Sequence, residues 1–259
     1  MMARSILALM LLLGTSAVAQ EKGEKTVILV HGAFADGSSW EKVIPLLQAK
    51  GLHVVVVQNP LTSLADDVAA VKRVIDAQKG PVILVGHSWA GTVITEAGAS
   101  DKVAALVYVA AFAPDVGESS SDLGRVAPPP PGLSSVYADP AGYLYLTPAG
   151  VAQDFAPDLP AAKTTVMAVT QGPIFGKAFD EKVTNAAWKT KPSWYIVAEK
   201  DRMIQPDVER AMAKKINAKV TSLPTSHVPM LSRPKDVTAV ILAATGKSIS
   251  KVAASAAQE

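Results

Sequence analysis

One short stretch of this chain, residues 82–91, most constrains how the chain can fold. It begins with Val-Ile-Leu-Val, an apolar run introduced by Gly80 and Pro81, which is typical of a buried strand. Gly-His-Ser-Trp-Ala-Gly follows at 86–91, and the next residues have helical character. A strand, a tight turn and a helix with Ser88 at the apex predict a strained backbone at that serine.

The turn departs slightly from the Gly-x-Ser-x-Gly pattern that usually surrounds a serine at the apex of such a strand–turn–helix unit. Its fifth position is Ala90, and a glycine, Gly91, comes one residue later. Alanine is small enough for a close approach of strand and helix, so we regard the departure as mild. The alternative is an ordinary glycine- and serine-rich turn between a strand and a helix.

Apolar strands and amphipathic helices alternate through most of the chain. Near-continuous apolar runs predict strands, and helical spacing between them predicts helices, as at residues 64–77. This alternation, with short turns, indicates an α/β fold with a doubly wound, mostly parallel six-stranded sheet. The predicted strands are 26–30, 53–57, 82–85, 103–109, 193–198 and 219–223.

The alternation stops between residues 114 and 191. This segment contains four consecutive prolines at 128–131 and only short helical stretches, such as 164–170. We interpret it as a cap inserted after the fourth strand and lying over the strand ends. A disordered linker is the alternative, but several aromatic residues supply more apolar surface than such linkers carry.

The first nineteen residues are predicted to be a signal peptide. Arg4 provides a positive start, residues 6–13 are apolar, and Ala17-Val18-Ala19 is a small-x-small cleavage site. The apolar run is too short to span a bilayer, although an uncleaved anchor is the alternative. We therefore expect export to the periplasm or the medium, a mature domain over residues 20–259 without stable membrane insertion, and a frayed tail at 247–259.

Composition excludes several kinds of protein. The 259 residues are 49% hydrophobic and carry a formal net charge of +2 with both signs mixed, so no nucleic-acid partner is expected. The chain has no cysteine, which excludes disulfides, thiolate catalysis and cysteine-ligated metals. Nothing in the sequence resembles a metal site or a nucleotide-binding loop, so no cofactor is expected.

A serine becomes a nucleophile when a base lies within hydrogen-bond reach, and the chain offers four histidines. His227 follows the last predicted strand, at the same sheet edge as Ser88, and is the predicted base. His53, in a strand, is interpreted as a core residue and His87 as a packing residue. His31 follows the first strand.

The base needs an acid to orient it, and this acid should follow a strand between Ser88 and His227. Asp201 fits best, because its loop can turn back toward His227. Glu199 lies nearer the strand and Asp115 follows the fourth strand, so both remain alternatives.

A tetrahedral intermediate requires two backbone N–H donors aimed at its oxygen. The residue after the serine, Trp89, provides one. The loop His31-Gly32-Ala33-Phe34 can supply the other, and we expect Phe34, with Ala33 as the alternative. A merely structural turn is the other interpretation of this loop.

These motifs together resemble those of the α/β-hydrolases, in the chain order serine, acid, histidine. The similarity is greatest to the branch of plant methylesterases, hydroxynitrile lyases and their bacterial esterase relatives, and it covers residues 25–245. It rests on residues 31–34 with Trp40, residues 86–91, Asp201 and residues 226–232. The resemblance implies a triad of Ser88, His227 and Asp201 that acts without a cofactor.

Three positions depart from relatives on this fold. Val228 stands where hydroxynitrile lyases of this branch carry a lysine, which argues for ester hydrolysis instead. The nucleophile is Ser88, whereas haloalkane dehalogenases use an aspartate. Trp89 is bulky, and we expect its side chain to narrow the acyl pocket.

The sequence thus predicts a serine hydrolase that cleaves small-molecule carboxylic esters of largely hydrophobic character through an acyl-enzyme. Two other functions would use the same site. The first is a ligand-binding receptor or pseudo-enzyme with negligible turnover. The second is a perhydrolase, lactonase or acyltransferase with the same triad.

Overall fold

The computed structural model describes residues 25–247. The predicted signal peptide, and all but the first residue of the predicted tail, lie outside the described residues. The main sheet has six parallel strands, as the sequence predicted, and their order in the structure is β2-β1-β3-β4-β8-β9. Their bounds are β1 Thr26–Val30, β2 His53–Val57, β3 Val82–His87, β4 Val103–Val109, β8 Ser193–Ala198 and β9 Lys219–Leu223.

The central strands are apolar because both faces of the sheet are covered. Every residue of β1 and β3 is buried, whereas the edge strands β2 and β9 are partly exposed. The structure corrects one prediction here: His53, at the start of β2, is exposed rather than in the core. It lies at the sheet edge, where its Nδ1 is 3.2 Å from Thr26 Oγ1.

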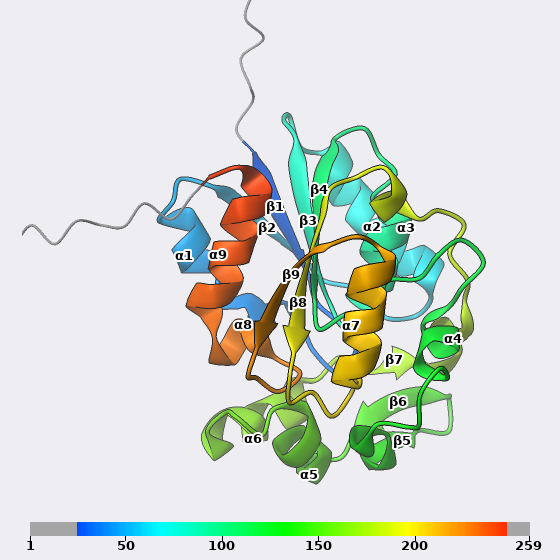
Figure 1. Cartoon of the computed structure of the whole chain (residues 1–259). Helices are drawn as coiled ribbons and strands as arrows, with labels where there is room; N and C mark the ends of the chain where they lie inside the picture. The colour runs from blue at the N-terminus through cyan, green and yellow to red at the C-terminus, as the bar shows by residue number, and fades with distance from the viewer. Residues whose placement is uncertain (1–24, 248–259) are drawn as a thin grey trace, which may run out of the picture.

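Helices cover both faces of this sheet (Figure 1). α1 (Ile44–Gln48) and α9 (Pro234–Thr245) contact each other on one face, and α2 (Leu64–Asp76) and α3 (Ala90–Ala97) contact each other on the other. α7 (Pro206–Lys215) packs on β8. A 3₁₀ turn at Gly37–Trp40 precedes α1.

The chain between β4 and β8 forms a layer below the tips of β8 and β9 in Figure 1, at the carboxyl end of the sheet. It contains a small antiparallel sheet of three strands, which the sequence did not predict. We call residues 114–191 the cap. Its regular elements are α4 Ser120–Gly124, β5 Val136–Ala138, β6 Tyr143–Leu146, α5 Pro148–Gly150, α6 Ala161–Thr170 and β7 Ile174–Phe175.

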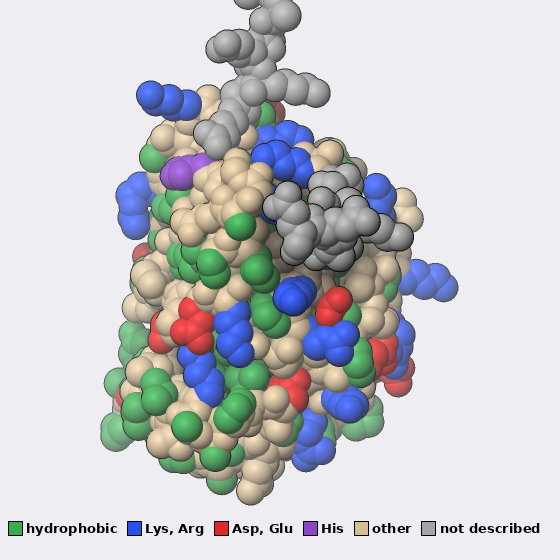
Figure 2. All heavy atoms as spheres, turned by 90° about the vertical axis from the view of Figure 1, so that its left-hand side faces the viewer, with side chains coloured by type: hydrophobic (Ala, Val, Ile, Leu, Met, Phe, Trp, Pro, Cys, Tyr) green, Lys and Arg blue, Asp and Glu red, His purple; other side chains and the backbone are tan. Residues whose placement is uncertain are grey.

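The face over α1 and α9 carries mixed charge. Figure 2 shows lysine and arginine side chains interspersed with acidic ones there, with no field of a single sign. Among the described residues, no helix has both the length and the apolar character needed to cross a bilayer.

Candidate active site

Ser88 occupies a strained turn between β3 and α3. Its φ angle is +54°, in the left-handed region that side chains other than glycine rarely adopt. The turn is held in place by the end of β4 and its following loop: the Ser88 N–H donates to the Val109 carbonyl at 3.2 Å, and the Phe112 N–H donates to the Ser88 carbonyl at 3.2 Å. The predicted strain at Ser88 is therefore present, and backbone contacts maintain it.

Two glycines allow this turn to pack. A Cβ on Gly86 would lie 2.6 Å from the Ala90 carbonyl oxygen, and one on Gly91 would overlap the Phe112 carbonyl oxygen. Ala90 itself is accommodated and fully buried. Gly86 thus allows the close approach of β3 and α3, and Gly91 allows that of α3 and the loop after β4.

His227 and Asp201 form a buried pair. His227 lies in the loop between β9 and the short helix α8 (Pro229–Ser232), and its Nδ1 is 2.5 Å from Asp201 Oδ2. The other carboxylate oxygen, Oδ1, accepts the N–H groups of Met203 at 2.6 Å and Ile204 at 2.9 Å. Because Nδ1 is engaged, the imidazole has Nε2 available for a substrate or a serine.

The two alternative acids lie elsewhere. Asp115 forms an ion pair with Lys189 at 2.5 Å, and Glu199 forms one with Arg210; all four side chains are partly exposed. Neither acid is bonded to His227. Of the three candidates, the structure brings Asp201 to the histidine.

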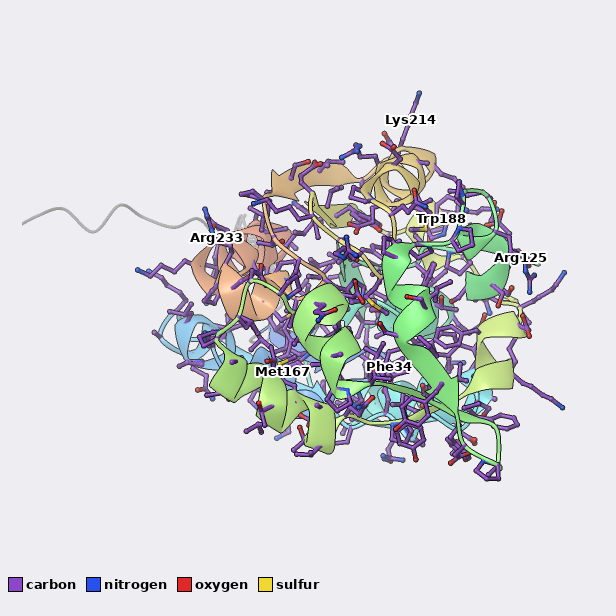
Figure 3. All side chains as sticks on the ribbon, turned by 90° about the horizontal axis from the view of Figure 1, so that it is seen from below. Phe34, Arg125, Met167, Trp188, Lys214 and Arg233 are labelled. Carbon is purple, nitrogen blue, oxygen red and sulfur yellow. The ribbon has the colours of Figure 1, made fainter. Side chains whose placement is uncertain are left out.

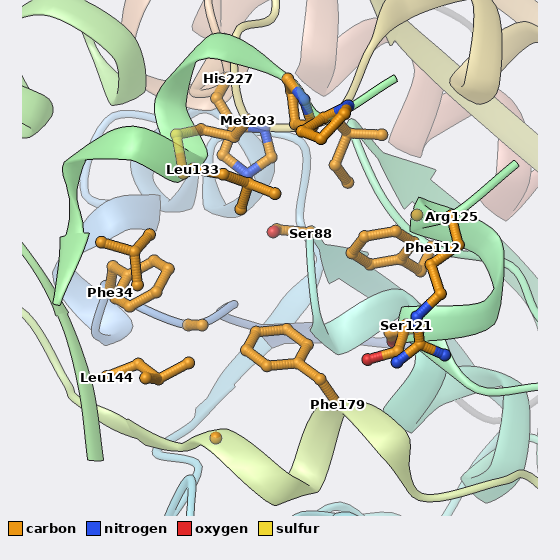
Figure 4. A pocket seen from close by; sticks show the side chains of 18 of the residues that line it. Phe34, Ser88, Phe112, Ser121, Arg125, Leu133, Leu144, Phe179, Met203 and His227 are labelled. Carbon is orange, nitrogen blue, oxygen red and sulfur yellow. The ribbon is translucent and has the colours of Figure 1, made fainter. Parts of the chain in front are cut away.

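Ser88 and His227 line the same pocket, which has a volume of about 530 Å³. Figure 4 shows the His227 ring beside the Ser88 hydroxyl. The walls are mainly apolar and come from both the main domain and the cap: Phe34, Phe112, Leu133, Leu144, Phe179 and Met203.

Polar groups gather at one end of this pocket, where Ser120, Ser121 and Arg125 line it. Arg125 forms ion pairs with Asp122 at 3.5 Å and Asp180 at 3.1 Å. Seen from below in Figure 3, Phe34 lies near the middle of this face and Arg125 at its edge. The reactive groups are therefore surrounded by apolar surface, and the charge lies at the rim.

The structure corrects the predicted role of the Phe34 amide. Its N–H donates to the Gly172 carbonyl of the cap at 2.9 Å, so it is not free for an oxyanion. The phenyl ring of Phe34 lines the pocket instead. Ala33, the alternative, also lines the pocket, and within residues 25–247 its N–H has no backbone acceptor. The amide of Trp89, the residue after the serine, stays the other predicted donor.

The Trp89 side chain also lies away from its predicted place. It is fully buried, its Nε1–H donates to Asp67 Oδ2 at 2.8 Å, and its ring meets that of Phe179 edge to face. The indole therefore does not narrow the pocket directly. Asp67 was not singled out from the sequence, because its partner is 22 residues away and no local motif marks it.

The remaining histidines, His87 and His31, hold the backbone of the site. His87 Nε2 lies 2.7 Å from the His227 carbonyl oxygen, and His31 Nε2 accepts the Asn59 N–H at 2.9 Å. Burial lowers the pKa of both imidazoles, which favours their neutral forms. The His87 side chain thus contacts the backbone of His227, the predicted base. In the described part of the chain, no three His, Cys, Asp or Glu side chains cluster as a metal site would require.

Several known hydrolases and esterases are similar to this chain. The chain is 28% identical to the probable hydrolase R7 of Phoma sp. over 85% of this chain and 98% of that protein. It is 26% identical to methylesterase 3 of Arabidopsis thaliana over 89% and 99% of the two chains. The crystal structure of a pyrethroid hydrolase matches with a TM-score of 0.76 at 24% identity, over 86% of this chain and 98% of that one.

These relatives support the prediction of a carboxylic ester hydrolase, and the structural match confirms the predicted fold. The model of the alpha/beta hydrolase family matches residues 27–240, which include every residue of the site described above. The protein belongs to the alpha/beta hydrolase family.

Proposed function

We propose that this protein is a serine esterase in which Ser88, His227 and Asp201 form the catalytic triad. The observation that supports it best is the buried His227–Asp201 pair beside a serine held at φ +54°, in a mainly apolar pocket. A nucleophile, its base and the group that orients the base are the three parts that acyl transfer requires.

The first half of the reaction forms an acyl-enzyme. Ser88 Oγ attacks the ester carbonyl carbon while His227 Nε2 takes the serine proton, and Asp201 stabilises the resulting imidazolium. The tetrahedral intermediate then breaks its bond to the alcohol oxygen, and His227 returns the proton to that oxygen. The alcohol leaves, and the acyl group remains on Ser88.

Two backbone amides are available for the negative oxygen of that intermediate. We assign them to Trp89 and Ala33, since the Phe34 amide is bonded to Gly172. Donors of this kind contribute about 3–4 kcal/mol each to the transition state in serine hydrolases. Water then attacks the acyl carbon with His227 again as base, and the acid is released.

The pocket indicates the substrate class. Its volume of about 530 Å³ and its aromatic and aliphatic walls suit a small-molecule ester with an apolar acyl or alcohol part. The names of the relatives, methylesterase and pyrethroid hydrolase, also denote action on small-molecule esters. We infer that this chain acts on the same broad class.

The test is hydrolysis of p-nitrophenyl esters from acetate to decanoate by the mature protein. We expect turnover with an optimum of acyl length, and Ser88→Ala should reduce kcat by about 10⁴-fold or more because the nucleophile is lost. Ser222→Ala, which removes an exposed hydroxyl on β9, is the matched control and should retain the wild-type rate. Turnover that survives in Ser88→Ala would refute the mechanism.

The same assay separates the other functions of this site. If Ser88 reacts with a serine-directed phosphonate but no ester is turned over, the protein is a receptor or pseudo-enzyme. If an alcohol or peroxide is preferred over water as the acyl acceptor, the protein is an acyltransferase or a perhydrolase. If lactones are the preferred substrates, it is a lactonase.

We also propose that the protein is exported. The proposal is supported by Arg4, the apolar residues 6–13 and the alanines at 17 and 19, the pattern of a cleavable leader.

A further inference from the structure

A second buried acid, Glu209, lies on α7 beside Asp201 and outside the pocket lining. Its side chain is completely buried, and its Oε2 accepts the N–H of Ala198, the last residue of β8, at 2.9 Å. Its Oε1 is also buried and has no hydrogen-bond partner among the described residues. A buried carboxyl oxygen without a donor is uncommon, because removing it from water is costly. The proton of an un-ionised acid on this oxygen would account for it.

Glu209 and Asp201 are anchored to the same residue: the Asp201 N–H donates to the Ala198 carbonyl at 3.1 Å, and the N–H of Ala198 donates to Glu209. Two neighbouring buried carboxyl groups can be joined by a hydrogen bond when one of them carries a proton. Asp201 already accepts hydrogen bonds from two backbone N–H groups and lies against His227 Nδ1, which is the pattern of a carboxylate. The proton between the two acids therefore belongs to Glu209.

We propose that Glu209 is a neutral carboxylic acid that donates a hydrogen bond to Asp201 and so positions the Asp201–His227 pair. This role rests on the triad proposed above. Glu209 touches neither substrate nor serine, so it is a positioning residue that acts through Asp201.

The surroundings of Glu209 favour the neutral form. The ionisable groups that face it are Asp201, Glu199 and the buried phenol Tyr195, and His227 lies beyond Asp201. Burial, followed by the charge of Asp201, raises the pKa of Glu209 well above its usual value. The neighbouring cation on α7, Arg210, pairs with Glu199 and Asp207 instead.

The proposal predicts how two substitutions change the dependence of kcat/KM on pH. The part concerned is the acid limb, where kcat/KM falls as the pH decreases. In Glu209→Met, Asp201 loses a donor and attracts the imidazole proton more strongly. The acid limb should therefore move up by about half a pH unit or more, with kcat reduced about tenfold and KM nearly unchanged. In Glu209→Gln, the amide can still accept from Ala198 and donate to Asp201, so the acid limb should stay in place and most of the lost rate should be rescued.

An infrared measurement tests the proton directly, without depending on activity. The difference spectrum between wild type and Glu209→Gln should contain the C=O stretch of a protonated carboxyl group at neutral pH. Glu199→Gln is the matched control, because it removes a nearby surface carboxylate; it should show only carboxylate bands and keep wild-type kinetics. This readout remains valid if the protein turns over no ester, so it separates failure of the present proposal from failure of the proposed function.

Three results would overturn the proposal. A carboxylate band for Glu209 would show that the side chain is ionised. A shift of the Glu209→Gln acid limb to lower pH would show the same, since a negative charge beside the pair would have been removed. Wild-type kcat and pH profile in a folded Glu209→Met, with reduced thermal stability alone, would make Glu209 merely structural.

Discussion

Asp67 lies on α2, one of the helices that cover the sheet, and connects this helix to Trp89, the residue after Ser88. Its two carboxylate oxygens accept the Leu61 N–H and the Trp89 indole N–H, both at 2.8 Å, and the side chain is fully buried. Because the Trp89 amide is assigned to the oxyanion, this acid supports the residue that bears the donor. Burying the charged form of such a carboxyl group costs free energy, because the group is removed from water.

That cost should appear as a pH dependence of stability. Burial raises the pKa of Asp67 to about 6, so between about pH 4 and pH 6 the folded protein holds a proton that the unfolded chain has released. The free energy of unfolding contributed by Asp67 therefore decreases as pH rises through this interval, by about 3 kcal/mol in total. Urea unfolding of wild type and Asp67→Asn from pH 4 to 7.5 measures this contribution.

In that comparison, the wild type should lose stability relative to Asp67→Asn as pH rises, because asparagine does not titrate. The variant also loses one acceptor for an N–H group, at a cost of about 1–3 kcal/mol that does not change with pH. A difference between the two proteins that is constant with pH would contradict the raised pKa.

At this scale, the sequence predicted the residues marked by local motifs. Ser88 and His227 stand in short recognisable segments, and Asp201 followed from chain order. The donor at Phe34 was wrong because its partner, Gly172, lies in the cap, whose path has no periodicity to read. The direction of the Trp89 indole was missed for a similar reason, since its partner, Asp67, lies on a helix that is far from Trp89 in the sequence.

At the scale of elements, the strand–turn–helix unit around Ser88 depends on Gly86 and Gly91, and a side chain at Gly91 would cause the more severe overlap. We expect Gly91→Ala to destabilise the protein by about 1–3 kcal/mol, because the new methyl group overlaps the Phe112 carbonyl and α3 must shift. The shift also moves Ser88, so kcat should fall with little change in KM.

Ala90→Gly is the matched control for this substitution. It restores the usual fifth position of the motif and should cost about 1 kcal/mol or less, as expected for glycine in a helix. Thermal unfolding and esterase kinetics of both variants decide between the two positions. Equal losses in the two variants would show that the glycine at 91 has no special role.

The strands of the main sheet were predicted with nearly the observed bounds, because each is a continuous apolar run between turns. β3 extends two residues further than expected, since Gly86 and His87 continue the pairing with Tyr108 and Val109. The small sheet of the cap was missed because its strands have only 3, 4 and 2 residues. Runs that short carry no readable alternation.

At the scale of the whole molecule, the proposed export can be measured by fractionation of a bacterium that has a periplasm. We expect a protein in the periplasm or medium whose N-terminus, read by mass spectrometry, is Gln20. Ala19→Phe should leave the leader attached, because the position before cleavage requires a small residue. Ala19→Ser is the control and should be processed normally; an intact N-terminus in wild type would refute the proposal.

Two backbone hydrogen bonds join the cap to the loop after β1. The Phe34 N–H donates to the Gly172 carbonyl at 2.9 Å, and the Gly172 N–H donates to the Ala35 carbonyl at 3.3 Å. The same loop carries the Ala33 amide that we assign to the oxyanion. An ester too large for the space under the cap would therefore displace the Ala33 amide, while the apolar walls of the pocket would still bind that ester. Such an enzyme discriminates between substrates by how fast it converts them, and a tightly held but oversized ester becomes an inhibitor.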